Sequence, residues 1–165
     1  MVRIEQVTLQ NLAVFVQVRL RALQESPWAF GSTYARESAF TDAEWHARLE
    51  RWNGVRGLGY LAIEDGVACG MAGALLDEQD PSRALLVSMW TAPSYRRKGV
   101  GRQLVEEVLG WAVQRGVQVV QLMVTSKNDS AIRFYEELGF ARTGREEPYP
   151  NDPAMAEYEM VRTIG

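Results

Sequence analysis

One segment near the middle of the chain constrains the fold more than any other. Residues 84–90 form an apolar run that indicates a buried strand, and a basic turn with glycines at 99 and 101 follows it. Apolar residues then recur at helical spacing from Val100 to Trp111. A strand, a turn and a helix in this order, followed by another apolar strand at 117–124, predict two parallel strands joined by a crossover helix.

The basic turn also has the chemical features of an anion site. Four positive charges lie within seven residues: Arg96, Arg97, Lys98 and Arg102. Gly99 and Gly101 allow backbone to approach a ligand closely, because glycine has no Cβ. The first turn of a helix presents unpaired N–H groups and the positive end of the helix dipole. The pattern therefore predicts a phosphate or pyrophosphate at the start of this helix.

Composition and rare residues exclude several kinds of site. The chain has 165 residues, 47% of them hydrophobic, and a net charge of −3, which fits one globular domain at 1–165. We therefore expect no nucleic-acid binding. Cys69 and His46 are the only residues of their kinds, so we expect no intramolecular disulfide, no metal site and no histidine-based triad. We find neither a signal peptide nor an apolar run of membrane length, and we expect a cytoplasmic protein.

The rest of the chain alternates between strand and helix patterns. Strands are predicted at 4–9, 60–63, 67–76, 84–90, 117–124, 140–143 and 156–162, and helices after Asn11, Thr41, Gly99 and either Asn128 or Ser130. Residues 28–40 are expected to be irregular or short helix, and 148–153 a proline-rich loop. Glu64-Asp65-Gly66 predicts a hairpin turn. This order indicates a mostly antiparallel sheet that contains one parallel pair.

Two motifs in this order resemble those of the GNAT superfamily of acetyl-CoA-dependent N-acetyltransferases. The first is Arg96-Arg97-Lys98-Gly99-Val100-Gly101, which fits the family's phosphate-binding pattern of Gln or Arg, two residues, Gly, one residue, and Gly or Ala. The second is residues 128–140, from Asn128 to Phe140. The resemblance is specific over residues 87–140 and extends to the element order of most of the chain. It implies an α+β domain: a six- to seven-stranded, mostly antiparallel sheet, one splayed parallel pair and about four helices.

Other phosphate-binding folds fit the glycines less well. A dinucleotide-binding fold needs its glycines after an early strand and an acidic residue about twenty residues later. Gln118 and Gln121 stand where that acid would be needed. A Gly-Lys-Ser/Thr nucleotide motif is also missing from the sequence.

The resemblance implies a site for acetyl-CoA. The pyrophosphate of the donor would lie on the backbone N–H groups of about residues 97–102, assisted by nearby basic side chains. Backbone groups of Met89 and Thr91 would bind the pantetheine arm where the parallel strands splay, and the N–H of Met89 would polarise the thioester oxygen. Asn128 matches an asparagine of the family that contacts the cofactor. The implied cofactor-binding residues are Met89, Thr91, Arg96, Arg97, Lys98, Gly99, Val100, Gly101, Arg102, Asn128 and Tyr135.

Tyr135 is the catalytic residue that the resemblance implies. The matching tyrosine of the family protonates the departing thiolate. A phenol with its ordinary pKa of about 10 is protonated at neutral pH and can act as this acid. The alternative is a structural tyrosine among apolar neighbours.

The general base and the acceptor stay open. Glu37, Glu64 and His46 are candidate bases by chemical type alone. In this architecture, residues 27–30, Tyr34 and the loop 148–153 would flank the acceptor pocket, and Asp152 would suit a cationic amine. We predict an N-acetyltransferase acting on a primary amine of a small molecule or peptide. Dimers are common in the family that the chain resembles, so the resemblance also implies a homodimer. The alternative from another class is an acyl-CoA-binding sensor without turnover.

Overall fold

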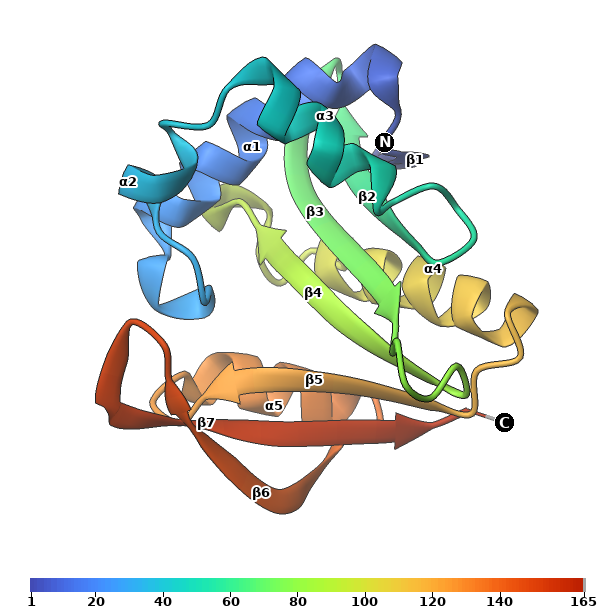
Figure 1. Ribbon diagram of the computed structural model, residues 1–165, viewed down its shortest axis with the longest axis vertical. Coiled ribbons are helices and arrows are strands. Elements are labelled where there is room, and N and C mark those ends of the chain that lie inside the picture. The colour runs from blue at the N-terminus through green and yellow to red at the C-terminus, as the bar shows by residue number, and fades with distance from the viewer. Residues whose placement is uncertain (165) are drawn as a thin grey trace.

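A computed structural model describes residues 1–164, in which a seven-stranded sheet has helices on both faces (Figure 1). The strands are β1 (Arg3–Gln6), β2 (Gly57–Glu64), β3 (Val67–Leu76), β4 (Arg83–Thr91), β5 (Val119–Thr125), β6 (Ala141–Tyr149) and β7 (Asp152–Thr163). The helices are α1 (Leu12–Glu25), α2 (Tyr34–Glu37), α3 (Asp42–Glu50), α4 (Val100–Gln114) and α5 (Asp129–Glu137), with 3₁₀ turns at Leu9–Asn11, Pro27–Ala29 and Pro93–Tyr95.

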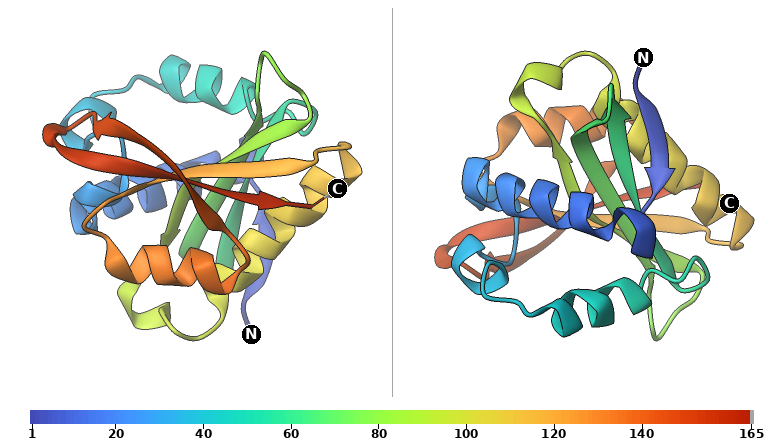
Figure 2. Two further views of the ribbon diagram at one scale, coloured as in Figure 1. Left: turned by 90° about the horizontal axis from the view of Figure 1, so that it is seen from below. Right: turned by 90° about the horizontal axis from the view of Figure 1, so that it is seen from above.

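The sheet has the predicted mixed topology. Its strand order is β1-β2-β3-β4-β5-β7-β6, and every neighbouring pair is antiparallel except β4 and β5. The α+β class and the single parallel pair are therefore confirmed, with five α-helices instead of about four. Helices α1–α3 lie on one face of the sheet, and α4 and α5 lie on the other (Figure 2). The core accordingly has two layers, one on each side of the sheet.

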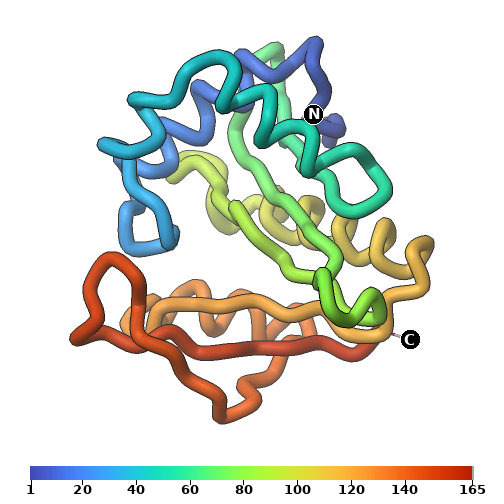
Figure 3. The backbone as a smooth tube through the Cα atoms, viewed as in Figure 1, coloured from blue at the N-terminus to red at the C-terminus, as the bar shows by residue number. Residues whose placement is uncertain are grey.

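The parallel pair is short, and its strands separate. Only Arg83–Leu85 of β4 pair with residues of β5, namely Val119–Gln121. Beyond Leu85 the two strands diverge, as the backbone trace shows (Figure 3). We call the unpaired stretch, residues 86–91 of β4 opposite 122–125 of β5, the open end of the pair.

A β-bulge in β4 lies within this open end. Gly73 of β3 pairs with Val87, and Met71 pairs with Trp90, so β4 advances three residues while β3 advances two. Ser88 takes a left-handed φ of 56°, a rare conformation for a residue other than glycine. In the strand pairing of residues 1–164, neither Ser88 nor Met89 has a partner. At these two residues β4 therefore departs from regular strand pairing.

Trp52 anchors the helices of one face to the sheet. Its indole lies over Gly59 and Gly73, which are directly opposite each other on β2 and β3. A Cβ at Gly59 would come within 2.2 Å of the ring, and one at Gly73 within 2.6 Å. Phe15 of α1 meets the same indole edge-on at 5.1 Å between ring centroids. The two glycines thus form the slot that brings Trp52 close to the backbone of the sheet.

Several predicted boundaries are wrong. The first strand ends at Gln6 instead of Leu9, because Leu9 belongs to a 3₁₀ turn. The proline-rich loop at 148–153 is instead a tight turn at Pro150 and Asn151, since β6 continues to Tyr149 and β7 begins at Asp152. Pro148 is tolerated because β6 is an edge strand. On its outer side no further strand of residues 1–164 pairs with β6, so a missing backbone N–H there removes no hydrogen bond of the sheet.

Replacing Gly59 with Ala should destabilise the fold, because the new methyl group would overlap the Trp52 ring. We expect a loss of about 1–3 kcal/mol in the free energy of unfolding, measured by urea denaturation. Gly110→Ala is the matched control: it lies in the interior of α4, and a Cβ there meets no atom within 4 Å. That change should stabilise by up to about 1 kcal/mol. Equal effects of the two substitutions would contradict the packing assigned to Trp52.

Candidate functional site

The basic turn positions the start of α4 at the open end of the β4–β5 pair. Arg97 and Gly99 both have left-handed φ angles, 62° and 85°, and they reverse the chain before Val100. A Cβ at Gly99 would meet no atom, so the backbone conformation is what favours glycine there. Gly101 differs, because a Cβ would lie 3.0 Å from the Phe134 ring of α5. The first turn of α4 is therefore packed closely against α5.

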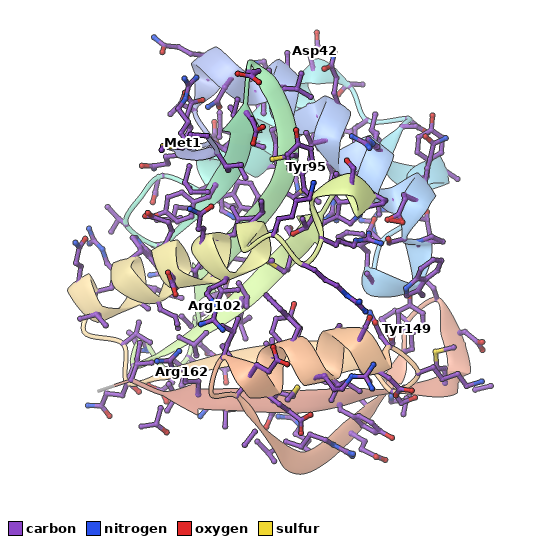
Figure 4. The ribbon with its side chains drawn as sticks, turned by 180° about the vertical axis from the view of Figure 1, so that it is seen from behind. Met1, Asp42, Tyr95, Arg102, Tyr149 and Arg162 are labelled. Atoms are coloured by element: carbon purple, nitrogen blue, oxygen red, sulfur yellow. The ribbon has the colours of Figure 1, made fainter. Side chains whose placement is uncertain are left out.

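The four basic side chains do not share one direction. All four are exposed, but Arg96 is folded back onto α1: its guanidinium pairs with the Glu25 carboxylate and lies 3.3 Å from Ser26 Oγ. Its Nε also donates to the carbonyl oxygen of Thr91, at 3.0 Å. Arg102 lies between α4 and the end of α5 (Figure 4). The Arg96 side chain and the Thr91 carbonyl thus have partners within the protein, and the cofactor contacts that the resemblance implies for them stay a prediction.

Glu25 completes this tie between α1 and the basic turn. Burial raises its pKa, but hydrogen bonds from Ser26 and Arg96 and the charge of Arg96 outweigh burial and lower the pKa overall. Trp90 Nε1 approaches the same carboxylate at 3.4 Å. The start of the turn is thereby fixed to both α1 and β4.

Tyr135 and Asn128 come from α5, on the same face of the sheet as α4. The Asn128 side chain caps α5 by accepting from the N–H of Ala131 at 3.3 Å. Tyr135 is buried between Phe134 and Phe140, and burial raises its pKa. Among residues 1–164, every side-chain oxygen that is sealed from solvent has a hydrogen-bond partner. The Tyr135 hydroxyl has no partner in this range, so it must keep some solvent-accessible surface. Its raised pKa keeps it protonated at neutral pH.

A cavity of about 350 Å³ opens on the other face, where the strands separate. Both strands contribute to it, β4 through residues 85–88 and β5 through residues 121–123. The remaining lining residues come from α1, the α1–α2 connection, α3 and its C-terminal end, β3 and β7: Arg19, Ala29, Phe30, Gly31, Arg48, Arg51, Trp52, Leu75 and Glu157. The cavity and the basic turn thus reach the same open end from opposite faces.

A buried ion-pair cluster forms one wall of the cavity. Arg19 binds both carboxylate oxygens of Glu37, at 2.9 and 3.0 Å, and Arg48 binds one of them at 2.8 Å. Arg19 also lies 3.4 Å from the Ser88 hydroxyl in the bulge. Burial alone would raise the pKa of Glu37, but its bonds and charge interactions with Arg19 lower it overall. Glu37 is therefore held as a carboxylate by two arginines and is poorly suited to accept a proton.

The other two candidate bases lie elsewhere. His46 is exposed on α3, with Nδ1 2.7 Å from the carbonyl oxygen of Asp42 in its own helix. Glu64 ends β2 at the hairpin turn. Neither lines the cavity in the part of the chain that the structure describes. The structure thus does not bring these residues to the open end.

Glu157 is the residue that our sequence reasoning missed. It lies on β7 opposite Thr125, the last residue of β5, and it lines the cavity. Burial raises the pKa of Glu157, and the negative charge of Glu147, its pairing partner on β6, raises this pKa further. Among the described residues that line the cavity, it is the one carboxylate. Side chains alternate between the two faces of a sheet along a strand. The sequence could therefore have placed Glu157 on the cavity face only if the register of β7 against β5 had been known.

The β6–β7 turn holds the α1–α2 connection over the cavity. Tyr149 Oη lies 2.9 Å from the carbonyl oxygen of Pro27 and 2.6 Å from that of Phe30, and Figure 4 shows Tyr149 at this junction. Asn151 Nδ2 donates to Phe30 and Ser32 carbonyls at 3.0 and 3.1 Å. These bonds join the two halves of the sheet across the open end.

The predicted acceptor side is thus only partly brought together. Ala29 and Phe30 line the cavity, whereas Trp28 and Tyr34 are exposed and do not. Asp152 is also exposed, and it accepts from the N–H of Ala154 at 3.2 Å within its own turn. The charged residues that line the cavity are Arg19, Arg48, Arg51 and Glu157, so the acid that lines it is Glu157 instead of Asp152.

The described residues form neither a metal-binding cluster nor a membrane-spanning helix. No group of three or more His, Cys, Asp or Glu residues within 1–164 could hold a metal ion. None of the helices in this range is both long and apolar enough to cross a membrane.

Replacing Glu37 with Gln should destabilise the protein by about 3–5 kcal/mol at neutral pH, because two arginines would lose their buried counter-charge. The pKa of Glu37 is lowered on folding, so its stabilisation is complete above the ordinary pKa of about 4.3 and is lost as pH falls through the lower folded value. Urea denaturation as a function of pH should therefore show the two proteins converging in acid. Glu50→Gln, at an exposed position of α3, should change stability by less than about 0.5 kcal/mol. A pH-independent difference would contradict this assignment.

Comparison with known proteins identifies the family. The model of the acetyltransferase (GNAT) family matches residues 19–140. The chain is 34% identical over 105 residues to the N-alpha-acetyltransferase RimI of Mycobacterium tuberculosis, covering 63% of this chain and 65% of that protein. It is 35% identical over 100 residues to the ribosomal protein bS18-alanine N-acetyltransferase of Escherichia coli, covering 59% and 64%. It is 29% identical over 92 residues to an aminoglycoside N(6')-acetyltransferase of Salmonella typhimurium, covering 52% and 63%.

Solved structures agree on the fold. A GNAT-family acetyltransferase from Streptococcus pneumoniae superposes with a TM-score of 0.86 at 23% identity, and the alignment covers all of both chains. A ribosomal-protein-alanine N-acetyltransferase from Brucella melitensis gives 0.82 at 20% identity, covering 98% of this chain and 99% of that one. The family model matches well over half of the chain, and the chain therefore belongs to the acetyltransferase (GNAT) family.

Proposed function

We propose that this chain is an N-acetyltransferase that moves the acetyl group of acetyl-CoA to a primary amine by direct attack in a ternary complex. The observation that carries the proposal is the open end of the β4–β5 pair. It meets the basic turn at the start of α4 on one face and a cavity on the other. Helix α5, which carries Tyr135, packs against the first turn of α4 through Phe134. The named relatives, which act on a ribosomal-protein alanine and on aminoglycosides, support an amine acceptor.

The donor side would use mainly backbone groups. The N–H groups of residues 97–102 would hold the pyrophosphate at the start of α4, with Arg97 and Lys98 adding charge. The unpaired backbone at Met89 would bind the pantetheine arm and polarise the thioester oxygen. Asn128 would act chiefly by capping α5, which positions Tyr135. Gly101 fits this arrangement, because a residue without a side chain is needed where the first turn of α4 meets the Phe134 ring.

Two side chains would move protons. Glu157 would accept a proton from the amine as its nitrogen bonds to the acetyl carbon, and Tyr135 would give its proton to the sulfur as the carbon–sulfur bond breaks. The products are an amide and CoA with a free thiol. Glu157 then loses its proton to water and the Tyr135 phenolate takes one from water, which restores both side chains. Burial supports the base role of Glu157, because it raises the carboxyl pKa toward the working pH. Burial also raises the pKa of Tyr135, which keeps the phenol protonated but makes it a weaker acid, so its role rests on the family resemblance.

Tyr135→Phe should lower kcat for thiol release by about 10²-fold or more while leaving the Kd for acetyl-CoA unchanged, because only the proton donor is lost. A panel of primary amines with thiol detection measures kcat, and calorimetry measures donor binding. Tyr60→Phe is the matched control, because Tyr60 lies on β2, away from the open end. Full activity of Tyr135→Phe would exclude the acid role. Tight acetyl-CoA binding with no turnover of any amine would favour the alternative, a sensor module.

Glu157→Gln should lower kcat at neutral pH by about 10²-fold and remove the acid limb of the kcat–pH profile. In the parent, kcat should rise with pH through the raised pKa of Glu157, since only the carboxylate accepts a proton. Glu147→Gln is the informative control: it removes the neighbouring negative charge, so the limb should move to lower pH and persist. An acid limb that is unchanged in both variants would contradict the base role.

A further inference from the structure

The cavity has an uneven distribution of charge. Three guanidinium groups line it, from Arg19, Arg48 and Arg51. Glu37 lies behind them and pairs with the first two. One carboxylate against three guanidinium groups leaves the wall formed by α1, α3 and residue 51 positively charged. Glu157 approaches from β7, on the side of the cavity that lies beyond β5.

These arginines are close enough to repel one another. Burial lowers the pKa of Arg48, and the charges of Arg19 and Arg51 lower it further, although Glu37 acts in the opposite direction. Arg19 and Arg48 already use hydrogen bonds to hold Glu37. Among the ion pairs of residues 1–164, none includes Arg51. An anionic ligand group beside Arg51 and Arg48 would offset this repulsion and bind through charge-assisted hydrogen bonds.

We infer that the acceptor is a small amine that also carries a carboxylate or a phosphate group, and that Arg51, with Arg48, binds this group. The inference rests on the proposed function and specifies its acceptor. A volume of about 350 Å³ is at the lower end of the range for ligand sites, about 300–1,000 Å³, and suits a molecule of amino-acid size. The anionic group would face the arginines and the amine would face Glu157. A polycationic amine would place one of its charges against the arginines.

The test compares amines of similar length and different charge: β-alanine, 2-aminoethyl phosphate, β-alaninamide and 1,3-diaminopropane. The measured quantity is kcat/KM for thiol release, expressed per unprotonated amine. We expect β-alanine or 2-aminoethyl phosphate to exceed β-alaninamide by roughly 10- to 100-fold, since hydrogen bonds to charged groups have this strength. The diamine should be the poorest substrate. The first two compounds distinguish a carboxylate from a phosphate as the preferred anion.

Variants assign the preference to the arginines. Arg51→Gln should reduce the ratio of kcat/KM for β-alanine to kcat/KM for β-alaninamide at least 5-fold. In Arg51→Glu, kcat/KM for 1,3-diaminopropane should exceed kcat/KM for β-alanine. Arg115→Gln removes an exposed arginine at the end of α4, on the other face of the sheet, and should leave the ratio unchanged. Equal kcat/KM for β-alanine, 2-aminoethyl phosphate and β-alaninamide, or an unchanged ratio in Arg51→Gln, would overturn the inference.

A binding measurement separates this inference from the proposed function. N-acetyl-β-alanine and its amide are titrated against the parent and Arg51→Gln in the presence of CoA, by calorimetry. Tighter binding of the acid that depends on Arg51, without acetylation of any amine, would support the anion site and overturn the proposed transfer. Acetylation of amines with no preference for anionic ones would leave the transfer standing and overturn the anion site. Equal binding of the acid and the amide, with no turnover, would overturn both.

Discussion

The separation of β4 from β5 is the constraint on which the rest of the structure depends. The pair is parallel, so a crossover is required, and α4 supplies it. Because α4 begins just beyond the end of β4, its N-terminus lies at the open end of the pair. Pairing stops after Leu85, and the bulge at Ser88 then leaves β4 without a regular partner on either side. One topological feature thus creates a site that can be reached from both faces of the sheet.

Separated strands would be unfavourable without compensation, because buried backbone N–H and C=O groups need partners. The protein supplies some of them. Arg96 satisfies the Thr91 carbonyl, and Arg19 reaches the Ser88 hydroxyl. Tyr149 and Asn151 bridge the two halves of the sheet through carbonyls of the α1–α2 connection. Among the described residues, Met89 lies outside the regular strand pairing, and an extended ligand that contains amides could pair with β4 there.

Features set by neighbouring residues could be predicted from the sequence, and features set by distant residues could not. The basic turn, the Asp65-Gly66 hairpin and the start of α5 near Asn128 each depend on local conformational preferences, and the structure confirms them. The Arg19–Glu37 pair joins residues 18 positions apart, and no local pattern indicates it. The place of Glu157 depends on the register between β7 and β5, and that of Arg96 on Glu25, 71 residues away. The family resemblance could not supply these contacts either, because each of them has at least one partner outside its two motifs.

The basic residues act in two different dielectric settings, and this separates their proposed roles. Arg97, Lys98 and Arg102 are exposed, so salt weakens their attraction for an anion and screens it beyond about 8–10 Å. Fixed backbone N–H groups beside them would provide the specific contacts for a pyrophosphate. Arg19 and Arg48 are largely withdrawn from water, where charges are screened much less. A misplaced charge in the cavity would therefore cost more than one at the basic turn. For this reason the exposed side chains of the basic turn suit the proposed attraction of the donor. Arg19 and Arg48, which are withdrawn from water, suit the proposed discrimination between acceptors.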